Sequence, residues 1–333
     1  MSGAKVSIII PNYNGAKDTI ECLDSMESLI QKEVVNVIIV DNGSKSEDVT
    51  LIENWIFENV KCEGKYIYEL QELNLEHQPN NYSNICIINN INNGYAGAIN
   101  IGIKYSNQLY KNVQYYWVLN NDTVIKENTL LNLLDFVSGK TSVGMVGSTI
   151  LEYHNPNVIQ YAGGARYYKL FSLSKSNLKG VKIDSLKSQN FKGPRLDYVS
   201  GASMFIPKTV IEKVGFFNES YFLYYEELDY TKRLEKEGYN VLWCKESVLY
   251  HKGGNSIGSR SVKRDGKSEL AEYYSNLSCL KFSNKFYSRI LFSLIFTNRF
   301  ILKSFSFLLK REIYLFRPLV RSYIDYLTSK KVI

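Results

Sequence analysis

Residues Tyr116–Thr123 read Tyr-Trp-Val-Leu-Asn-Asn-Asp-Thr, an apolar run that stops at a cluster of oxygen-bearing side chains. The apolar part has the character of a strand in a buried sheet. In open α/β sheets, ligands bind outside the carboxyl ends of the strands, where backbone and side-chain groups converge on a crevice. The stretch therefore predicts that a buried sheet presents Asp122 to a metal ion and a phosphate group.

The same order of strand, polar loop and helix recurs in the N-terminal half of the chain. Val6–Pro11 and Val34–Val40 are short apolar runs rich in β-branched residues, and Ile85–Ile88 is a third. Helical periodicity follows over Ala16–Leu29 and again over Ala96–Tyr105. Such alternation predicts an α/β fold with a mostly parallel central sheet, helices on both faces and right-handed crossovers.

The second half is less regular. Strands are expected at Gly144–Leu151, Leu196–Pro207 and Val241–Tyr250, with helices at Glu127–Val137 and near Glu227–Glu237. Two segments predict irregular structure: residues 59–83, which are polar and poorly periodic, and residues 160–195, which are rich in Gly, Lys, Ser and Tyr.

Composition bounds the class of protein. A chain of 333 residues with 45% hydrophobic residues can fill a proper core. Its five scattered cysteines contain no Cys-x-x-Cys spacing, which argues against a disulfide framework or a zinc site and favours a cytosolic protein. The first strand is expected from Val6, so no signal peptide is expected before it. Arg299 and Lys303 interrupt the most apolar window, Ile290–Leu309, so no membrane crossing is expected.

The net charge of +7 is concentrated at the carboxyl end. Residues 280–333 hold eleven basic and two acidic residues, so the rest of the chain is slightly negative. On a helical wheel Arg299, Lys303 and Lys310 share one side of a phenylalanine-rich segment. A basic, aromatic amphipathic helix is typical of contact with an anionic membrane, which we expect here. The alternative is a helix that packs its apolar side on the rest of the protein.

Two aspartates end neighbouring strands of the predicted sheet. Asp41 can accept the imide N–H of a uracil or thymine base, or it can cap the following turn. Asp122, with Asn120 and Asn121, can surround a divalent cation bound to a diphosphate, because Mg²⁺ is typically held by one or two carboxylates and substrate phosphates. The alternative for Asp122 is an N-cap of the next helix.

Three carboxylates, Glu226, Glu227 and Asp229, crowd a helix start behind a run of aromatic residues. Acids at a helix N-terminus are favoured by the helix dipole, which is the simple explanation. Crowding can also raise the pKa of one carboxylate and make it a general base. His251 follows another strand end, where it is either a ligand or a hydrogen-bonded structural residue.

Several blocks, in order and spaced over nearly the whole chain, resemble family 2 glycosyltransferases of the GT-A fold. The blocks are Val6–Gly15, Val40–Ser44, Asn92–Gly102, Leu119–Thr123, Gly201–Ala202, Val214–Glu219, Phe222–Arg233 and His251–Ser256. The chain is most similar to bacterial rhamnosyltransferase-type members, which share the Asn-Gly opening, an arginine such as Arg233 and a basic aromatic tail.

The resemblance implies a role for each matching position. A nucleotide-sugar site would comprise Pro11, Asn12, Tyr13, Asp41, Asn93, Gly94, Asn120, Asn121, Asp122, Gly201 and Ala202. Asp122 and His251 would face a divalent cation, Mg²⁺ or Mn²⁺. The acidic motif would supply the catalytic base, with Glu227 as first candidate and Glu226 and Asp229 as the others.

Two positions depart from the family pattern. Asn120 stands where the family's DxD motif begins, which weakens the expected metal dependence and favours a role for Asn120 and Asn121 in orienting the nucleotide. Glu227 stands where the base is normally Asp, so the base would be one methylene longer. Asp229 therefore remains a reserve candidate.

The resemblance implies an inverting enzyme that moves a sugar from a nucleotide diphosphate sugar to a hydroxyl of a lipid-linked or growing cell-surface polysaccharide. We expect dTDP-rhamnose as donor, with a UDP-hexose as the alternative. The expected organisation is a GT-A domain over residues 1–258, with a nucleotide-sugar half at about 1–125 and an acceptor half at about 126–258. Residues 259–333 form the tail, and the protein is expected in the cytoplasm at the inner face of the cell membrane.

Three other functions are alternatives to glycosyl transfer. A non-catalytic nucleotide-sugar or glycan-binding module of the same fold would explain the two departures. Nucleic-acid binding is disfavoured because no recognised module accompanies the basic tail. A dinucleotide dehydrogenase is disfavoured because no strand is followed by G-x-G-x-x-G. The sequence leaves homo-oligomer formation open.

Overall fold

The computed structural model describes residues 4–60, 65–69, 82–187, 193–253 and 268–329. Its N-terminal half is a parallel sheet of five strands in the order β5-β1-β2-β4-β3. The strands are β1 (Val6–Asn12), β2 (Val35–Asp41), β3 (Lys65–Glu69), β4 (Tyr82–Asn89) and β5 (Tyr115–Leu119). The helices between them are α1 (Ala16–Asp24), α2 (Glu27–Gln31), α3 (Ser46–Asn59) and α4 (Gly94–Leu109).

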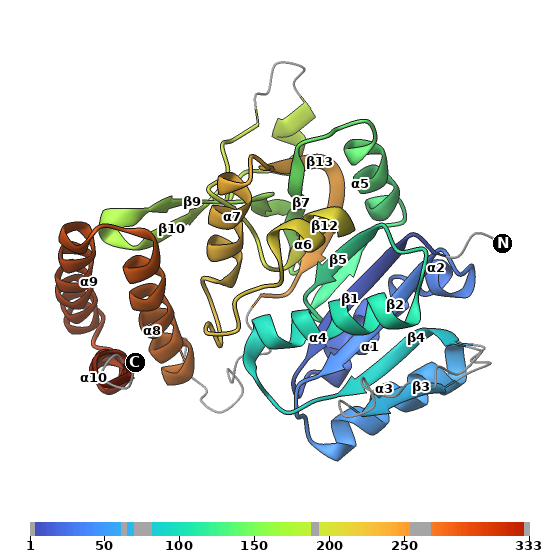
Figure 1. Ribbon diagram of the computed structural model, residues 1–333, viewed down its shortest axis with the longest axis horizontal. Helices are drawn as coiled ribbons and strands as arrows, with labels where there is room; N and C mark the ends of the chain where they lie inside the picture. Colours follow the sequence, from blue (N-terminus) through green and yellow to red (C-terminus); the bar gives the residue numbers. More distant parts are fainter. Residues whose placement is uncertain (1–3, 61–64, 70–81, 188–192, 254–267, 330–333) are drawn as a thin grey trace.

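The parallel strands are buried on both faces, as their continuous apolar sequences predict. Along β1, Ile8 and Ile10 contribute to one core cluster and Ile9 to the other. The first cluster lies against α1 and α3, and the second lies against α4. The α/β architecture expected from the alternating pattern is therefore present (Figure 1).

Beyond β5 the sheet becomes mixed. Strand β12 (Ser203–Pro207) inserts antiparallel between β5 and β7 (Val143–Glu152). The sheet continues through β8 (Asn155–Ala162), β9 (Gly164–Tyr168) and β10 (Leu173–Ser176). The remaining elements are β6 (Thr123–Ile125), α5 (Thr129–Val137), η2 (Lys169–Phe171), η3 (Ile183–Lys187), β11 (Tyr198–Val199), α6 (Lys208–Val214), α7 (Glu226–Lys236) and β13 (Asn240–His251).

Two segments expected to be irregular contain strands. In the first, residues 65–69 form β3, which pairs in parallel with β4. In the second, β9 and β10 form an antiparallel hairpin that reaches the C-terminal helices (Figure 1). Residues 61–64 and 70–81 of the first segment lie outside the described residues. The strands form because pairing with other strands can recruit polar segments whose own sequence pattern is weak.

The C-terminal segment packs on the rest of the protein. It consists of α8 (Glu269–Phe286), α9 (Arg289–Lys310), η5 (Ile313–Leu315) and α10 (Phe316–Ser329). From α8, Ser278 Oγ donates to the Leu223 carbonyl at 2.8 Å, and Phe282 is fully buried with Tyr221 and Leu228. The expected boundary at residue 258 lies outside the described residues.

Helix α9 is long and apolar enough to cross a membrane by length and composition alone. The sequence predicted that Arg299 and Lys303 exclude a crossing. By length and composition, however, two charges do not exclude a membrane-spanning helix. Both side chains turn inward, toward α8. Arg299 donates to Asn276 Oδ1 at 2.7 Å, and Lys303 lies 2.8 Å from Glu272 Oε1. These two charges are thus not part of an outward basic face.

Candidate active site

The parallel strands bring their carboxyl ends to one edge, and Asp41 lies there at the end of β2. Its Oδ1 accepts from Asn12 Nδ2 at 2.8 Å, and its Oδ2 accepts from the Ser44 amide at 2.9 Å. Asp41 therefore braces the loops after β1 and β2. Pro11 lies beside this pair, and Tyr13 is 42% exposed at the rim.

Asn121 turns away from this edge and into the protein. Its Nδ2 lies 3.1 Å from Thr19 Oγ1 and 3.3 Å from both Asn12 Oδ1 and the Gly15 carbonyl. The side chain is buried. Asn121 therefore joins the loop after β5 to the start of α1, and its amide nitrogen is directed at these partners within the chain.

Asp122 and His251 are brought together by the pairing of β6 with β13, in which His251 lies opposite Thr123. His251 Nε2 lies 3.1 Å from Asp122 Oδ1 and 3.3 Å from Asn120 Nδ2. On the other side of the ring, Nδ1 lies 2.6 Å from Gln160 Oε1. Because an amide oxygen only accepts, Nδ1 donates to Gln160, and Nε2 is the ring nitrogen that faces Asp122 and Asn120.

This pair has the chemistry of a divalent cation site. Asp122 is buried, and its Oδ1 has no donor in hydrogen-bonding geometry. A buried carboxylate oxygen without a hydrogen-bond partner, next to an imidazole nitrogen, fits a cation, and Gln160 is the kind of second partner that orients a ligating histidine. Within the part of the chain that the structure describes, no three His, Cys, Asp or Glu side chains converge on one point. A cation here would therefore need oxygen atoms from a substrate.

Tyr95, in the first turn of α4, connects this loop to the acidic motif. Its hydroxyl lies 2.8 Å from both Asn120 Oδ1 and the Gly201 carbonyl. A side chain on Gly201 would place its Cβ 3.3 Å from Glu227 Oε1. Burial raises the pKa of Tyr95 well above its usual value, with a further contribution from the nearby glutamates, so the hydroxyl keeps its proton.

Gly201 and Ala202 reach the site because β12 runs antiparallel to β5. This pairing sets Ser203 opposite Leu119, so the start of one strand meets the end of the other. The Ala202 carbonyl accepts from the Asn120 amide at 3.2 Å. Gly201 thus lies between Tyr95 and the candidate base.

Glu226 and Glu227 form a close carboxyl pair at the start of α7. Burial raises the pKa of Glu227 to about 7. Burial, followed by the charge of Glu227, raises the pKa of Glu226 well above its usual range. Glu226 is fully buried and holds the proton, and Glu227 is partly accessible. Glu227 is therefore ionisable near neutral pH and able to accept a proton.

Asp229 is separated from this pair. Its Oδ1 accepts from Arg233 Nε at 2.8 Å, and its Oδ2 accepts from Lys285 Nζ at 2.6 Å and from the Tyr221 hydroxyl at 3.1 Å. The carboxylate has no exposed surface. The structure does not bring this reserve candidate to the substrate side, and it gives Asp229 the role of joining α7 to α8.

A cavity of about 270 Å³ contains Glu227. The β9–β10 hairpin supplies one wall, with Ser172 and Ser174, and the aromatic segment before α7 supplies Tyr224 and Tyr225. The C-terminal helices contribute Ser275, Arg299 and Lys303, and Leu173, Tyr198 and Leu228 complete the lining. Tyr224 and Tyr225 have φ values of 66° and 72°, a left-handed conformation that non-glycine residues adopt at a cost and that is common at functional sites.

An amide network surrounds the start of α4. Asn90 Nδ2 donates to Asn93 Oδ1 at 3.0 Å and to Asn42 Oδ1 at 2.8 Å. Asn42 in turn donates to the Gly94 carbonyl at 3.2 Å. Gly94 has φ +86°, and a Cβ there would lie 2.3 Å from the Phe222 carbonyl oxygen, so only glycine fits. Asn93 and Gly94 thus set the position of Tyr95.

The site includes residues that were not predicted, namely Tyr95, Asn42, Asn90 and Gln160. Tyr95 belongs to one of the blocks that carried the family resemblance, so its position in that block was an available signal. Gln160 had none, since it comes from a strand that the sequence did not predict.

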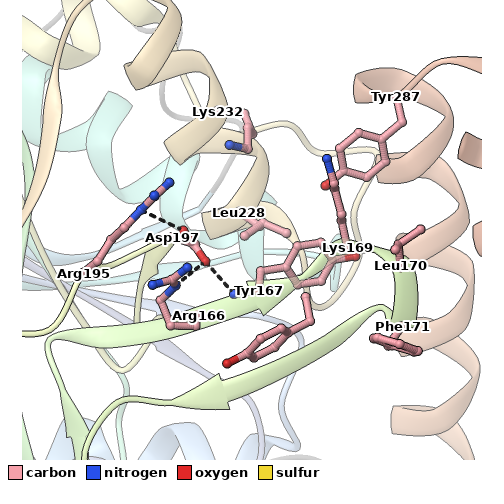
Figure 2. A pocket seen from close by; sticks show the side chains of 11 residues that line it. Arg166, Tyr167, Lys169, Leu170, Phe171, Arg195, Asp197, Leu228, Lys232 and Tyr287 are labelled. Atoms are coloured by element: carbon pink, nitrogen blue, oxygen red, sulfur yellow. Dashed lines mark hydrogen bonds and ion pairs between the residues drawn. The ribbon is translucent and has the colours of Figure 1, made fainter.

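A larger cavity, of about 460 Å³, is lined by other residues of the β9–β10 hairpin and includes none of the predicted site residues (Figure 2). Arg166, Lys169, Arg195 and Lys232 line it together with several aromatic rings. Asp197 compensates part of this charge, because Arg166 Nε lies 2.8 Å from its Oδ2. Basic side chains therefore dominate the lining of this cavity.

Known proteins similar to this chain are glycosyltransferases. The model of the family described as "Glycosyl transferase family 2" matches residues 7–68 and 67–214. The low-salt glycan biosynthesis hexosyltransferase Agl10 of Haloferax volcanii is 28% identical over 254 residues, covering 74% of this chain and 66% of that protein. The uncharacterized glycosyltransferase RP339 of Rickettsia prowazekii is 26% identical over 220 residues, covering 65% and 54%. The chain spans between about half and two thirds of the length of these relatives.

Solved structures show the same fold at low identity. Residues 1–349 of TarS from S. aureus, in complex with UDP-GlcNAc, superpose with a TM-score of 0.55 at 15% identity, over 97% of this chain and 80% of that one. The mannosyltransferase PcManGT from Pyrobaculum calidifontis, in complex with GDP-Man and Mn²⁺, gives 0.50 at 13% identity, over 98% and 88%. The fold is that of GT-A enzymes, and the chain belongs to glycosyl transferase family 2.

Proposed function

We propose that the protein is an inverting glycosyltransferase in which Glu227 is the catalytic base. One observation carries the proposal: Glu227 lines a cavity beside a protonated neighbour, Glu226, and is linked through Gly201 and Tyr95 to the loop that holds Asp122. A base on one side and a cation-compatible carboxylate on the other match a direct displacement at a sugar carbon.

The reaction follows from these positions. Glu227 accepts the proton of an acceptor hydroxyl, the hydroxyl oxygen forms a bond to the anomeric carbon, and the bond from that carbon to the diphosphate oxygen breaks. A single displacement inverts the configuration at this carbon and needs only one base, unlike the carboxylate pair of a glycoside hydrolase. The burial that raises the pKa of Glu227 to about 7 suits proton transfer near neutral pH.

We propose that Asp122 and His251 hold a divalent cation, Mg²⁺ or Mn²⁺, together with the donor diphosphate. The unsatisfied Asp122 Oδ1 supports this role, as does the Mn²⁺ bound to the structurally similar PcManGT. When bound, such an ion neutralises charge on the departing diphosphate. The side chain of Asn120 lies within hydrogen-bonding distance of both Tyr95 and His251. Its proposed role is therefore to orient the loop that carries Asp122.

For the donor we propose a nucleotide diphosphate sugar, dTDP-rhamnose first and a UDP-hexose second. The preference for rhamnose rests on the sequence resemblance, and the similarity to TarS bound to UDP-GlcNAc supports the alternative. In this proposal the uracil or thymine base of the nucleotide lies beside Asp41, which is buried, and Tyr13, which is exposed. Asn93 and Gly94 act by placing Tyr95, and Asn121 acts by joining two loops.

The proposed acceptor is a hydroxyl of a lipid-linked or growing cell-surface polysaccharide, bound in the cavity that contains Glu227. The similarity to a glycan biosynthesis hexosyltransferase supports a glycan acceptor. We further propose a cytoplasmic location at the inner face of the cell membrane. Residues 1–258 would form the catalytic domain, and the C-terminal helices would complete its acceptor side.

Release of nucleoside diphosphate tests this function. Wild-type protein is incubated with dTDP-rhamnose, UDP-galactose, UDP-N-acetylglucosamine or UDP-glucose, each with Mg²⁺, with Mn²⁺ or with EDTA. We expect one donor to be turned over, with less release in EDTA. Donor binding in a thermal-shift assay without release or transfer under any condition would favour the non-catalytic binding module instead.

A further inference from the structure

Helix α9 distributes its side chains in the opposite way to a surface helix of a soluble protein. Apolar residues recur on its outer face, where Leu294, Ile301, Phe305 and Leu308 are 50%, 57%, 60% and 60% exposed. The basic residues in the body of the helix, Arg299 and Lys303, lie on the inner face. A large apolar face without charges marks an interaction surface.

The inward charges are fixed by specific partners. Arg299 is 3% exposed, and its guanidinium donates to Asn276 Oδ1, to the Ser275 carbonyl and to the Ser172 carbonyl at 2.7, 2.9 and 3.1 Å. Lys303 lies 2.8 Å from the buried Glu272. Rotating α9 to present these charges outward would break this network and leave Glu272 buried without its partner. The apolar face is therefore a stable property of the fold.

A second apolar element adjoins α9. The bond from Arg299 to Ser172 fixes the tip of the β9–β10 hairpin against the helix, and at this tip Leu170 and Phe171 are 42% and 52% exposed. Figure 2 shows both residues at the hairpin tip, beside the C-terminal helices. Lys169 of the same tip is also exposed. The outer face of α9 and this tip together are called the outer surface below.

We propose that the outer surface rests in the interface of a lipid bilayer, with α9 lying along the membrane rather than crossing it. Three observations favour lipid over a second copy of the chain. Helix α9 has the length and composition of a membrane-embedded helix. Its exposed charged residues, Arg289 and Lys310, are at its two ends, where they can reach headgroups. Exposed basic residues that follow α9, Arg311 and Arg317, complement anionic lipid.

This position has a consequence for the substrate, which rests on the proposed function. Arg299 and Lys303 line the cavity of Glu227 from the inner face of α9, and the outer face of the same helix is the lipid surface. An α-helix with side chains is about 10 Å across. The cavity therefore lies about one helix width from the bilayer, which suits an acceptor sugar carried on a membrane lipid.

Vesicle sedimentation of the full chain tests the lipid contact. The probes are phosphatidylcholine vesicles with and without phosphatidylglycerol, at low and high salt. One variant carries Ile301→Asn, Phe305→Asn and Leu308→Asn on α9. Its matched control carries Leu51→Asn, Phe57→Asn and Leu131→Asn, which change comparably exposed apolar residues on α3 and α5. Circular dichroism and thermal unfolding check that both variants fold.

We expect wild-type protein and the control to bind vesicles in high salt. The α9 variant should bind vesicles with an affinity at least about tenfold lower, because interfacial affinity scales with buried apolar area. Equal binding by both variants, or no binding by wild type, would overturn the proposal. Binding that requires phosphatidylglycerol and is lost in high salt would also overturn the proposal, because it would assign membrane binding to basic residues and not to the apolar face. A dimer in analytical ultracentrifugation that only the α9 variant disrupts, with unchanged vesicle binding, would assign the surface to a second copy.

Activity separates this inference from the proposed function. The α9 variant should keep nucleotide release with a soluble saccharide acceptor and lose about tenfold with a lipid-linked acceptor in vesicles. Equal loss with both acceptors would contradict the placement of the cavity beside the membrane. Absence of turnover in every protein, wild type included, would refute the proposed function and leave the vesicle result to stand on its own.

Discussion

Glu227 and Asp229 lie two residues apart on α7, and their surroundings are opposite. Glu227 faces a cavity, and burial raises its pKa to about 7. Asp229 faces α8 and accepts from Arg233, Lys285 and Tyr221. Residues two positions apart on a helix point to different sides. A carboxylate bound by two cationic side chains holds the fold together, and one that faces a cavity is available for proton transfer.

The strongest test of this comparison is Glu227→Gln. Loss of a general base typically costs 10²–10⁴-fold, so we expect transfer to fall by about 10³-fold while donor affinity stays within about threefold. Steady-state kinetics and donor titration measure the two effects. If Glu227→Gln transfers at the wild-type rate, Glu227 is not the base. Glu226→Gln is the informative companion, because it preserves the neutral state that Glu226 already holds and should lose less activity.

Asp229→Asn should instead lower stability. The substitution removes the charge that pairs with Arg233 and Lys285. We expect the free energy of unfolding to fall by about 1–3 kcal/mol, as measured by urea denaturation, because charged hydrogen bonds around a buried carboxylate are lost. The folded fraction should keep most of its transfer rate. Wild-type stability combined with lost transfer would reverse the roles that we assign to Asp229 and Glu227.

The pH dependence should follow Glu227. Transfer requires its ionised form, so kcat/KM should fall about tenfold per pH unit below about 7 and level off above it. The stability of the fold should change with pH in the opposite direction to the transfer rate, because burial favours the protonated form of Glu227. A carboxyl whose folded pKa is raised to about 7 favours folding fully below its unfolded pKa near 4.3, and this contribution is lost as the pH rises to 7 and above.

Glu227→Gln should therefore be more stable than wild type at pH 8 and equally stable near pH 4, as measured by denaturation at both pH values. Asp229→Asn should show no such gain at pH 8. A pH profile that is flat between 5 and 8, together with an unchanged stability difference, would contradict proton transfer by Glu227.

The smallest expected effect concerns Tyr95, which connects the two sides of the site. Tyr95→Phe removes the hydroxyl that lies 2.8 Å from Asn120 Oδ1 and from the Gly201 carbonyl. One lost hydrogen bond of about 1 kcal/mol predicts a decrease in transfer of about five- to tenfold. Tyr116→Phe, which removes another buried hydroxyl, on β5, serves as the control. If both substitutions have equal effects on transfer, Tyr95 does not act as the link.

Much of the donor side could be predicted from the sequence. Asp41 and Asp122 were placed at one edge because each follows a buried apolar run and parallel strands end together. His251 was placed there by the same reasoning, since its strand also ends at a polar loop. The Gly201–Ala202 pair came only from the family resemblance, because an antiparallel strand brings its beginning, not its end, to this edge.

Less of the acceptor side could be predicted. Residues 160–195 have no periodicity, yet their hairpin forms a wall of the cavity and supplies the surface next to α9. Without the family resemblance the sequence does not rank the three acids of the motif, and contacts with Arg233 and with Lys285 of α8 separate Asp229 from Glu227. The basic residues of α9 suggested an outward charged face, whereas Asn276 and Glu272 draw them inward.

The sequence by itself therefore determined the α/β class, the buried strands β1, β2, β4 and β5, the polar residues at their carboxyl ends and the family of the protein. Each of these depends on neighbouring residues and on hydrophobic periods that can be read locally. Tertiary structure alone decided which carboxylate faces the cavity, which residues complete that cavity and that the exposed face of α9 is apolar. Those properties depend on partners far away in the chain, and a local pattern carries no record of the partner that a side chain will meet.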